Sequence, residues 1–191
     1  MSDNSITHLV SQLGNLLLPR NCTLAVAESC TGGMLASAIV SDVDASPILE
    51  RAFIVYSIDA KCDLLGLDRQ RVEECEGVAE DVARTMAEAT LANSRADLAV
   101  AITGFAGPRE GDEEVGLIHL ATSTVRRSRH QVLHLGDIGR LAACRSAVET
   151  ALYMLLDEAS SILTVPRISG GPRGQHHVQS SGPSGEGMDN S

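Results

Sequence analysis

The chain has 191 residues, of which 43% are hydrophobic and 21% are charged, so it is long enough for one domain with a sizeable core. A formal net charge of −10, with two Tyr, two Phe and no Trp, opposes nucleic-acid binding, which needs basic groups and stacking platforms. No apolar run can span a bilayer and the first ten residues lack a signal-peptide pattern, so we expect no membrane partner and a cytoplasmic protein.

The chain begins with a helical pattern and then a strand. Apolar residues recur at helical spacing after Ser5, a candidate N-cap, and Pro19 ends this first helix. Residues 23–27 form a short apolar run typical of a strand buried on both faces. Residues 34–40 resume helical spacing behind two glycines. This order predicts a strand, a tight turn and a helix.

A second strand-to-helix junction follows in the sequence. Residues 51–56 predict a strand, and residues 57–66 predict a helix with Ser57 as its N-cap and Gly66 as its C-terminal stop. Residues 79–94 then predict a long amphipathic helix.

The third junction combines a buried strand with a polar exit. Residues 97–102 predict the strand, which continues directly into TGFAGP, residues 103–108. Two further strands, residues 115–124 and 129–135, are joined by a basic segment and predict a hairpin. A closing helix is predicted over residues 139–159.

These elements predict an α/β fold. Their order, α-β-α-β-α-α-β-β-β-α, favours a three-layer α/β/α sandwich around a mixed, mostly parallel sheet with a late antiparallel strand. Residues 1–163 form the predicted domain. Residues 164–191 are rich in Gly, Ser, Pro and Gln and predict a flexible tail. In such sheets ligands bind at the carboxyl ends of the parallel strands, where all three junctions lie.

The cysteines predict neither a disulfide framework nor a zinc site. They are five in number, scattered, and without a C-x-x-C pair. We therefore expect reduced thiols.

Ser29, in the first junction, is a candidate nucleophile. A hydroxyl one turn before a helix can attack a carbonyl while the backbone amides of residues 30–33 stabilise the oxyanion. The alternative is a helix N-cap, which this stretch alone favours because Ala27 replaces the first glycine of a G-x-S-x-G elbow. Cys30 is a competing nucleophile, ranked below Ser29 because no histidine is placed to activate it.

A serine nucleophile needs a base, and no histidine falls at a strand-to-helix junction. Lys61 lies just past the N-cap of the second junction, where the helix terminus and partial burial would lower its pKa and let the neutral amine act as the base. A solvated surface charge is the alternative for this lysine, and a core aromatic is the alternative for Tyr56. In the third junction, Thr103 and its small neighbours allow a planar or phosphorylated ligand to approach the backbone, or simply form a turn.

Taken in order, three segments closely resemble the C-terminal domain of competence-inducible CinA-type proteins: AESCTGG (27–33), YSIDAK (56–61) and ITGFAGP (102–108). The resemblance covers residues 6–156. That domain also occurs alone, as a nicotinamide mononucleotide amidohydrolase. The resemblance therefore implies an α/β/α fold and hydrolysis of a carboxamide to a carboxylate and ammonia, without a metal or cofactor.

Carried onto matching positions, the resemblance implies Ser29 as the nucleophile, Lys61 as its base and Tyr56 beside them. It also implies a small-molecule nucleotide as the substrate and a homodimer. The residues expected to bind the substrate belong to the first and third junctions and to the closing helix. They are Glu28, Cys30, Thr31, Gly32, Gly33, Thr103, Gly104, Phe105, Ala106, Gly107 and Arg140.

The sequence departs from the family pattern at several places. Ile58 replaces the Asn of Y-S-N-x-A-K, and Ala79 stands where the family often has Ser. The acidic segment GPREGDEEVG, residues 107–116, replaces a longer glycine-rich loop. Two inserted residues in GDIGR leave open whether Arg140 or Arg145 reaches a phosphate.

We therefore expect a nicotinamide-nucleotide amidase that converts nicotinamide mononucleotide to nicotinate mononucleotide and ammonia by a Ser-Lys mechanism through an acyl-enzyme. The alternative is a catalytically weak pyridine-nucleotide-binding module of the same fold, which the departures favour. Retention of Ser29, Tyr56 and Lys61 favours the enzyme. In this family a second domain with pyrophosphatase activity can precede the amidohydrolase domain. None precedes Met1, so we expect that activity to be absent.

Overall fold

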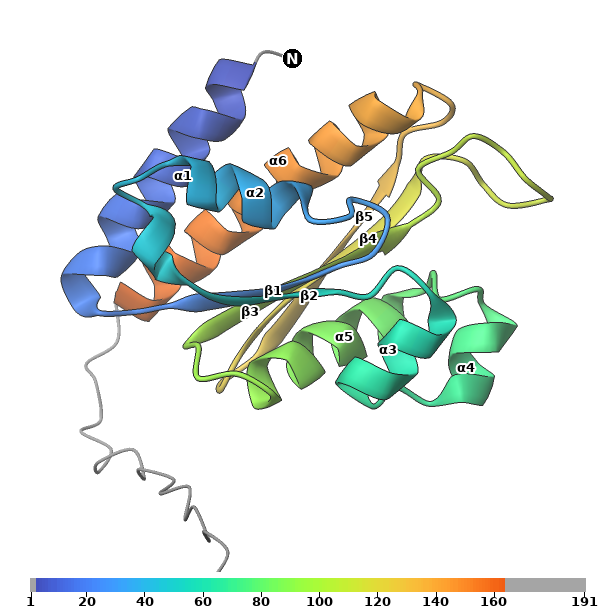
Figure 1. The fold of residues 1–191 in the computed structure, drawn as a ribbon, viewed down its shortest axis with the longest axis horizontal. Helices are drawn as coiled ribbons and strands as arrows, with labels where there is room; N and C mark the ends of the chain where they lie inside the picture. The colour runs from blue at the N-terminus through green and yellow to red at the C-terminus, as the bar shows by residue number, and fades with distance from the viewer. Residues whose placement is uncertain (1–2, 164–191) are drawn as a thin grey trace, which may run out of the picture.

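A five-stranded sheet runs through the middle of residues 3–163, the part of the chain that this computed structural model describes (Figure 1). The predicted tail, residues 164–191, lies outside the described residues. The strands are β1 (Leu24–Glu28), β2 (Leu49–Ile54), β3 (Leu98–Gly104), β4 (Leu117–Thr124) and β5 (Ser128–His134).

The sheet has the order β2-β1-β3-β4-β5. β1 pairs in parallel with both β2 and β3, whereas β4 pairs antiparallel with both β3 and β5. Only β4 therefore runs against the other strands of this sheet. The predicted mixed, mostly parallel sheet with a late antiparallel strand is confirmed.

Helices cover both faces of the sheet, which confirms the three layers (Figure 1). One layer contains α1 (Asp3–Leu17), α2 (Met34–Ser41) and α6 (Arg140–Leu163), with short 3-10 turns at Leu18–Arg20 and Ser46–Ile48. The other contains α3 (Ile58–Leu65), α4 (Arg69–Glu74) and α5 (Glu80–Ala92). None of these helices, all within residues 3–163, is long and apolar enough to cross a lipid bilayer.

Each layer encloses its own apolar core. Val26 packs in the cluster beneath α1, α2 and α6, whereas its neighbour Ala27 packs in the cluster on the α5 side. Successive side chains of a strand point to opposite faces of the sheet, so a continuous apolar run supplies both cores. This explains why β1 and most of β3 are buried.

The predicted capping residues form the two ends of α3. Ser57 caps the helix, because its hydroxyl accepts the Ala60 amide at 3.0 Å. Gly66 ends the helix in the left-handed region, with φ +71°. This conformation suits glycine, which has no Cβ to clash.

Other boundaries differ from the predictions. α1 begins at Asp3, so the N-cap predicted at Ser5 is wrong, and the Ser5 hydroxyl instead donates to Glu149 on α6. The sequence patterns also missed α4, which Asp68 caps through the Arg71 amide. This helix has six residues and buries only Val72, so it is too short to show a helical period.

Two strands are shifted relative to the sequence patterns. β2 ends at Ile54 rather than at residue 56, so Val55 and Tyr56 lie beyond the strand. β3 continues to Gly104 because Thr103 and Gly104 still pair with β4. The first two residues of the predicted polar exit are therefore part of the sheet.

Candidate active site

The carboxyl ends of β2, β1 and β3 meet at one edge of the sheet, as the sequence predicted. The amide of Ser29, the first residue after β1, donates to the carbonyl of Ile102 in β3 at 3.0 Å. On the other side, the amide of Val55 donates to the carbonyl of Glu28 at 2.8 Å. These bonds place Val55, Ser29 and the last residues of β3 side by side.

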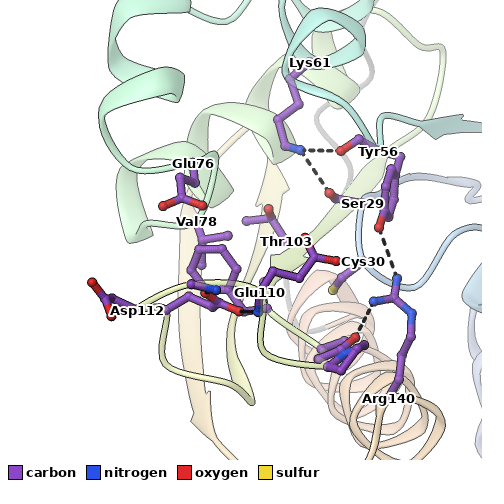
Figure 2. Close-up of a pocket in the computed structure, with 17 residues that line it drawn as sticks. Ser29, Cys30, Tyr56, Lys61, Glu76, Val78, Thr103, Glu110, Asp112 and Arg140 are labelled. Atoms are coloured by element: carbon purple, nitrogen blue, oxygen red, sulfur yellow. Dashed lines mark hydrogen bonds between the residues drawn. The ribbon is translucent and has the colours of Figure 1, made fainter.

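A cavity of about 370 Å³ opens over this edge (Figure 2). Many of the residues predicted for the site line it: Ser29, Cys30, Tyr56, Lys61, Thr103, Gly104, Phe105, Ala106, Gly107 and Arg140. No histidine of residues 3–163 lines this cavity. Within the same residues, no group of three or more His, Cys, Asp or Glu side chains is arranged to hold a metal ion.

Lys61 and Ser29 contact each other at the base of this cavity. Lys61 projects from α3, and its Nζ lies 2.9 Å from Ser29 Oγ. The same nitrogen lies 3.1 Å from the carbonyl oxygen of Val55 and 3.3 Å from that of Tyr56. The side chain is 2% exposed, so the sequence alternative of a solvated surface charge is wrong.

The surroundings of Lys61 make its amine easier to deprotonate than that of an exposed lysine. Burial lowers the pKa of Lys61 from its ordinary value, because the charged form loses its hydration. A neutral amine has two N–H donors and one lone pair. The carbonyls of Val55 and Tyr56 can accept the two donors, and the lone pair then faces the Ser29 hydroxyl. This is the arrangement that a serine nucleophile needs from its base.

Cys30 is a weaker candidate nucleophile. Burial raises the pKa of its thiol to about 12, so the reactive thiolate is scarce near neutral pH. This environment agrees with the ranking of Cys30 below Ser29.

Glu28 does not line the cavity of Ser29, and its carboxylate bonds to the start of α2 instead. Its carboxylate is fully buried and accepts the Thr31 hydroxyl at 2.6 Å. It also accepts the amides of Gly33, Leu35 and Ala36 at 3.2, 3.1 and 2.8 Å. The carboxylate of Glu28 therefore offsets the positive end of the α2 helix dipole, and these amides are not available to a ligand.

These hydrogen bonds leave fewer backbone amides for the predicted oxyanion site. The amide of Gly33 bonds to Glu28 and that of Gly32 bonds to the Ser29 carbonyl at 3.1 Å, so neither can serve an oxyanion. The amides of Cys30 and Thr31 have no hydrogen bond to another residue within the described part of the chain. Of these two residues, only Cys30 lines the cavity of Ser29.

Thr31, Gly32 and Gly33 line a second cavity, between α1, α2 and the start of α6. Arg145 lines this second cavity, whereas Arg140 lines the cavity of Ser29. Of the two arginines, Arg140 is therefore the one that lies in the cavity of the candidate nucleophile.

Arg140 and Tyr56 form one wall of the Ser29 cavity. An Nη of Arg140 donates to the Gly107 carbonyl at 2.7 Å, and the other lies 3.4 Å from the Tyr56 hydroxyl. Figure 2 shows the Tyr56 ring reaching toward Arg140. Tyr56 therefore contacts Lys61 through its backbone carbonyl, and its phenol belongs to the Arg140 side of the cavity.

Acidic residues also line the cavity, and they were not predicted as site residues. They are Glu76, Glu110, Asp112 and Glu113. In Figure 2, Glu76 and Asp112 lie on the side of the cavity away from Arg140. Glu110, Asp112 and Glu113 belong to the acidic loop that follows TGFAGP, and this position is a sequence signal for the site. Nothing in the pattern around Glu76 indicates the site.

Comparisons with known proteins show the family of this chain. Residues 6–159 match the family described as the CinA C-terminal domain. A CinA-like protein of Gloeobacter violaceus is 40% identical over 153 residues, which cover 78% of this chain and 36% of that protein. The nicotinamide-nucleotide amidohydrolase PncC of Escherichia coli is 39% identical over 128 residues, which cover 66% of this chain and 78% of that one.

Solved structures give the same result. The crystal structure of the competence/damage inducible protein CihA from Agrobacterium tumefaciens is similar to this fold with a TM-score of 0.77 and 38% identity. The match covers 82% of this chain and 96% of that one. The chain spans about a third of the length of the CinA-like relative, but most of the length of PncC and CihA.

Proposed function

The chain belongs to the CinA C-terminal domain family, and from that premise we propose that it hydrolyses nicotinamide mononucleotide to nicotinate mononucleotide and ammonia. The observation that carries this proposal is the 2.9 Å contact between Lys61 Nζ and Ser29 Oγ at the base of a ligand-sized cavity. The activity in the name of the 39% identical relative, PncC, supports the choice of substrate.

In the first half of the reaction, Ser29 attacks the substrate carboxamide. The neutral Lys61 amine takes the proton of the Ser29 hydroxyl as Oγ bonds to the carboxamide carbon. The negative charge that develops on the carboxamide oxygen is stabilised by the free amide of Cys30, which lines the cavity of Ser29. The C–N bond then breaks, and the departing nitrogen takes the proton from Lys61 and leaves as ammonia.

In the second half, water releases the product. Lys61 is neutral again after the departure of ammonia, so it takes a proton from the water that attacks the Ser29 ester. When the ester bond breaks, Ser29 Oγ recovers a proton from Lys61, and the product leaves as the acid, which ionises to the nicotinate carboxylate by losing its proton to solvent. One water molecule is consumed for each carboxylate and ammonia produced.

The charges that line the cavity support a zwitterionic substrate. Nicotinamide mononucleotide has a positive pyridinium ring and a negative phosphate. Arg140 offers a cation on one wall, and Glu76 and Asp112 offer carboxylates on another. The substrate phosphate would bind Arg140, and the ring would lie nearer the acidic side.

A catalytically weak binding module is the second candidate. The observation that favours it is the excess of carboxylates, Glu76, Glu110, Asp112 and Glu113, over the single arginine of the cavity. Such an excess weakens the binding of a phosphate. Incubation with nicotinamide mononucleotide separates the two candidates. The amidase releases ammonia with wild-type protein and none with Ser29→Ala, whereas the module binds the nucleotide by calorimetry without releasing ammonia.

A further inference from the structure

Gly77 covers the Lys61 side chain. A Cβ atom at Gly77 would lie 3.0 Å from Lys61 Cε, 3.3 Å from Cδ and 3.4 Å from Nζ. The backbone of Gly77 therefore packs directly on the aliphatic stem and the amine. Its φ of +73° also favours glycine, because a side chain would be strained in this conformation.

Two hydrogen bonds hold Gly77 in this position. Its amide donates to the carbonyl of Val72, in α4, at 2.7 Å. Its carbonyl accepts the hydroxyl of Thr103, near the end of β3, at 2.6 Å. The preceding residue, Glu76, also has a left-handed φ, of +52°, which is uncommon for a residue with a side chain. Such a conformation persists where neighbouring contacts enforce it.

Thr103 is not free to serve the substrate as a hydrogen-bond donor. The side chain is fully buried, and its single hydroxyl hydrogen is committed to the Gly77 carbonyl. Thr103 lies beside Ser29 at the sheet edge, so its hydroxyl links the floor of the site to the segment that covers the base.

We propose that Thr103 is a positioning residue whose hydroxyl holds Gly77 over Lys61 and so keeps water away from the amine beside Ser29. The effect of Thr103 on catalysis rests on the proposed amidase function, in which the Lys61 amine takes the proton of Ser29. The clamp itself, defined as Thr103 and Gly77, is a property of the protein without substrate. It can therefore be tested without turnover.

The test substitutes Thr103→Val, which keeps the shape of the side chain and removes the hydroxyl. The Gly77 carbonyl loses its partner, the covering segment loosens, and water reaches the amine. The sequence contains one lysine, so protein labelled with ¹³C-lysine gives a single side-chain NMR signal whose pH titration reports Lys61 alone. We expect the pKa of Lys61 to rise by about one pH unit in Thr103→Val. The acid limb of kcat/KM should move to higher pH by the same amount.

Thr122→Val is the matched control. Thr122 is also a fully buried threonine of the sheet, but its hydroxyl has no hydrogen-bond partner within residues 3–163. This substitution makes the same chemical change away from the clamp, so the pKa of Lys61 should stay at the wild-type value. Thr103→Ser, which keeps the hydroxyl, should also retain the wild-type pKa.

An unchanged pKa of Lys61 in folded Thr103→Val would overturn the inference. If Thr103→Val does not fold, Gly77→Ala provides a second test, because its methyl group would lie 3.0 Å from Lys61 Cε, so the segment and the Lys61 side chain must separate and the pKa should rise. An unchanged pKa in that variant would equally refute the clamp. Failure of the wild-type protein to release ammonia would refute the proposed function. An active enzyme in which these substitutions leave the pKa of Lys61 unchanged would refute the clamp alone.

Discussion

Lys61 Nζ lies 2.9 Å from Ser29 Oγ, although 32 positions separate the two residues in the sequence. Ser29 follows β1 and Lys61 belongs to α3, the helix that follows the neighbouring strand β2. The carbonyls of Val55 and Tyr56, between β2 and α3, complete the surroundings of the amine. The main chain at the ends of two parallel strands thus fixes the position of Lys61 relative to Ser29.

The first prediction tests the nucleophile. Ser29→Ala should abolish the release of ammonia from nicotinamide mononucleotide, because no other hydroxyl contacts the Lys61 amine among the described residues. The loss of one hydrogen bond should change the free energy of unfolding by only about 1 kcal/mol. Ammonia release and chemical denaturation measure the two effects. Undiminished ammonia release by Ser29→Ala would exclude Ser29 as the nucleophile.

The second prediction tests the base. Lys61→Arg keeps a positive charge, but a guanidinium does not deprotonate in proteins, so turnover should fall by about 10²- to 10⁴-fold. Lys61→Met, which keeps the length of the side chain without an amine, should be equally inactive. Steady-state kinetics on both variants gives the comparison. An arginine variant with wild-type kcat and a raised KM would show that Lys61 binds the substrate rather than acting as the base.

The third prediction concerns stability and pH. Burial lowers the pKa of Lys61 in the folded protein, whereas the unfolded chain keeps the ordinary value of about 10.4. Between the two pKa values the unfolded state binds the extra proton, so the contribution of Lys61 to the free energy of unfolding rises as pH rises through this window. Below the lowered pKa, both states bind the proton and the contribution is constant.

Denaturation at a series of pH values, with Lys61→Met as the control, measures this contribution. The difference in unfolding free energy between wild type and Lys61→Met should change in favour of wild type as pH rises. A difference that stays constant up to pH 10 would contradict a lowered pKa for Lys61.

The fourth prediction tests the arginine of the cavity. Arg140→Gln should raise the KM for nicotinamide mononucleotide by about tenfold or more, since it removes the charged hydrogen bond that we propose between Arg140 and the phosphate. The matched control is Arg145→Gln, because Arg145 lines the second cavity. Arg140→Gln should raise the KM far less when the substrate is the nucleoside, which has no phosphate. An equal loss with both substrates would assign Arg140 to the cavity wall instead.

The fifth prediction separates two roles for Glu28. Glu28→Ala leaves the Thr31 hydroxyl and the amides of Gly33, Leu35 and Ala36 without their acceptor, so unfolding should become easier by about 3 kcal/mol or more. Thermal or chemical denaturation measures this loss. Glu110→Ala, on the rim of the cavity, should change stability little. A stable Glu28→Ala protein with a raised KM would restore the predicted substrate-binding role of Glu28.

The sequence by itself determined the order of the strands and of every α-helix but α4 within residues 3–163, and the edge of the sheet at which Ser29 and Lys61 meet. Apolar runs and helical spacing predicted all five strands, and Ser57 and Gly66 marked the ends of α3 because caps depend on neighbouring residues alone. The rule that parallel strands end at one edge of the sheet then brought the junctions at Ser29 and Lys61 together. Local signals were weakest where an element was short, as in α4.

The tertiary structure alone decided what each polar group does. Glu28 binds the start of α2, Thr103 binds Gly77, and Arg140 rather than Arg145 reaches the cavity of Ser29. Each of these outcomes depends on the direction of a side chain and on elements that are distant in the sequence. A hydroxyl, carboxylate or guanidinium bonds to whichever partner the packing brings within about 3 Å, and spacing along the chain does not encode that partner.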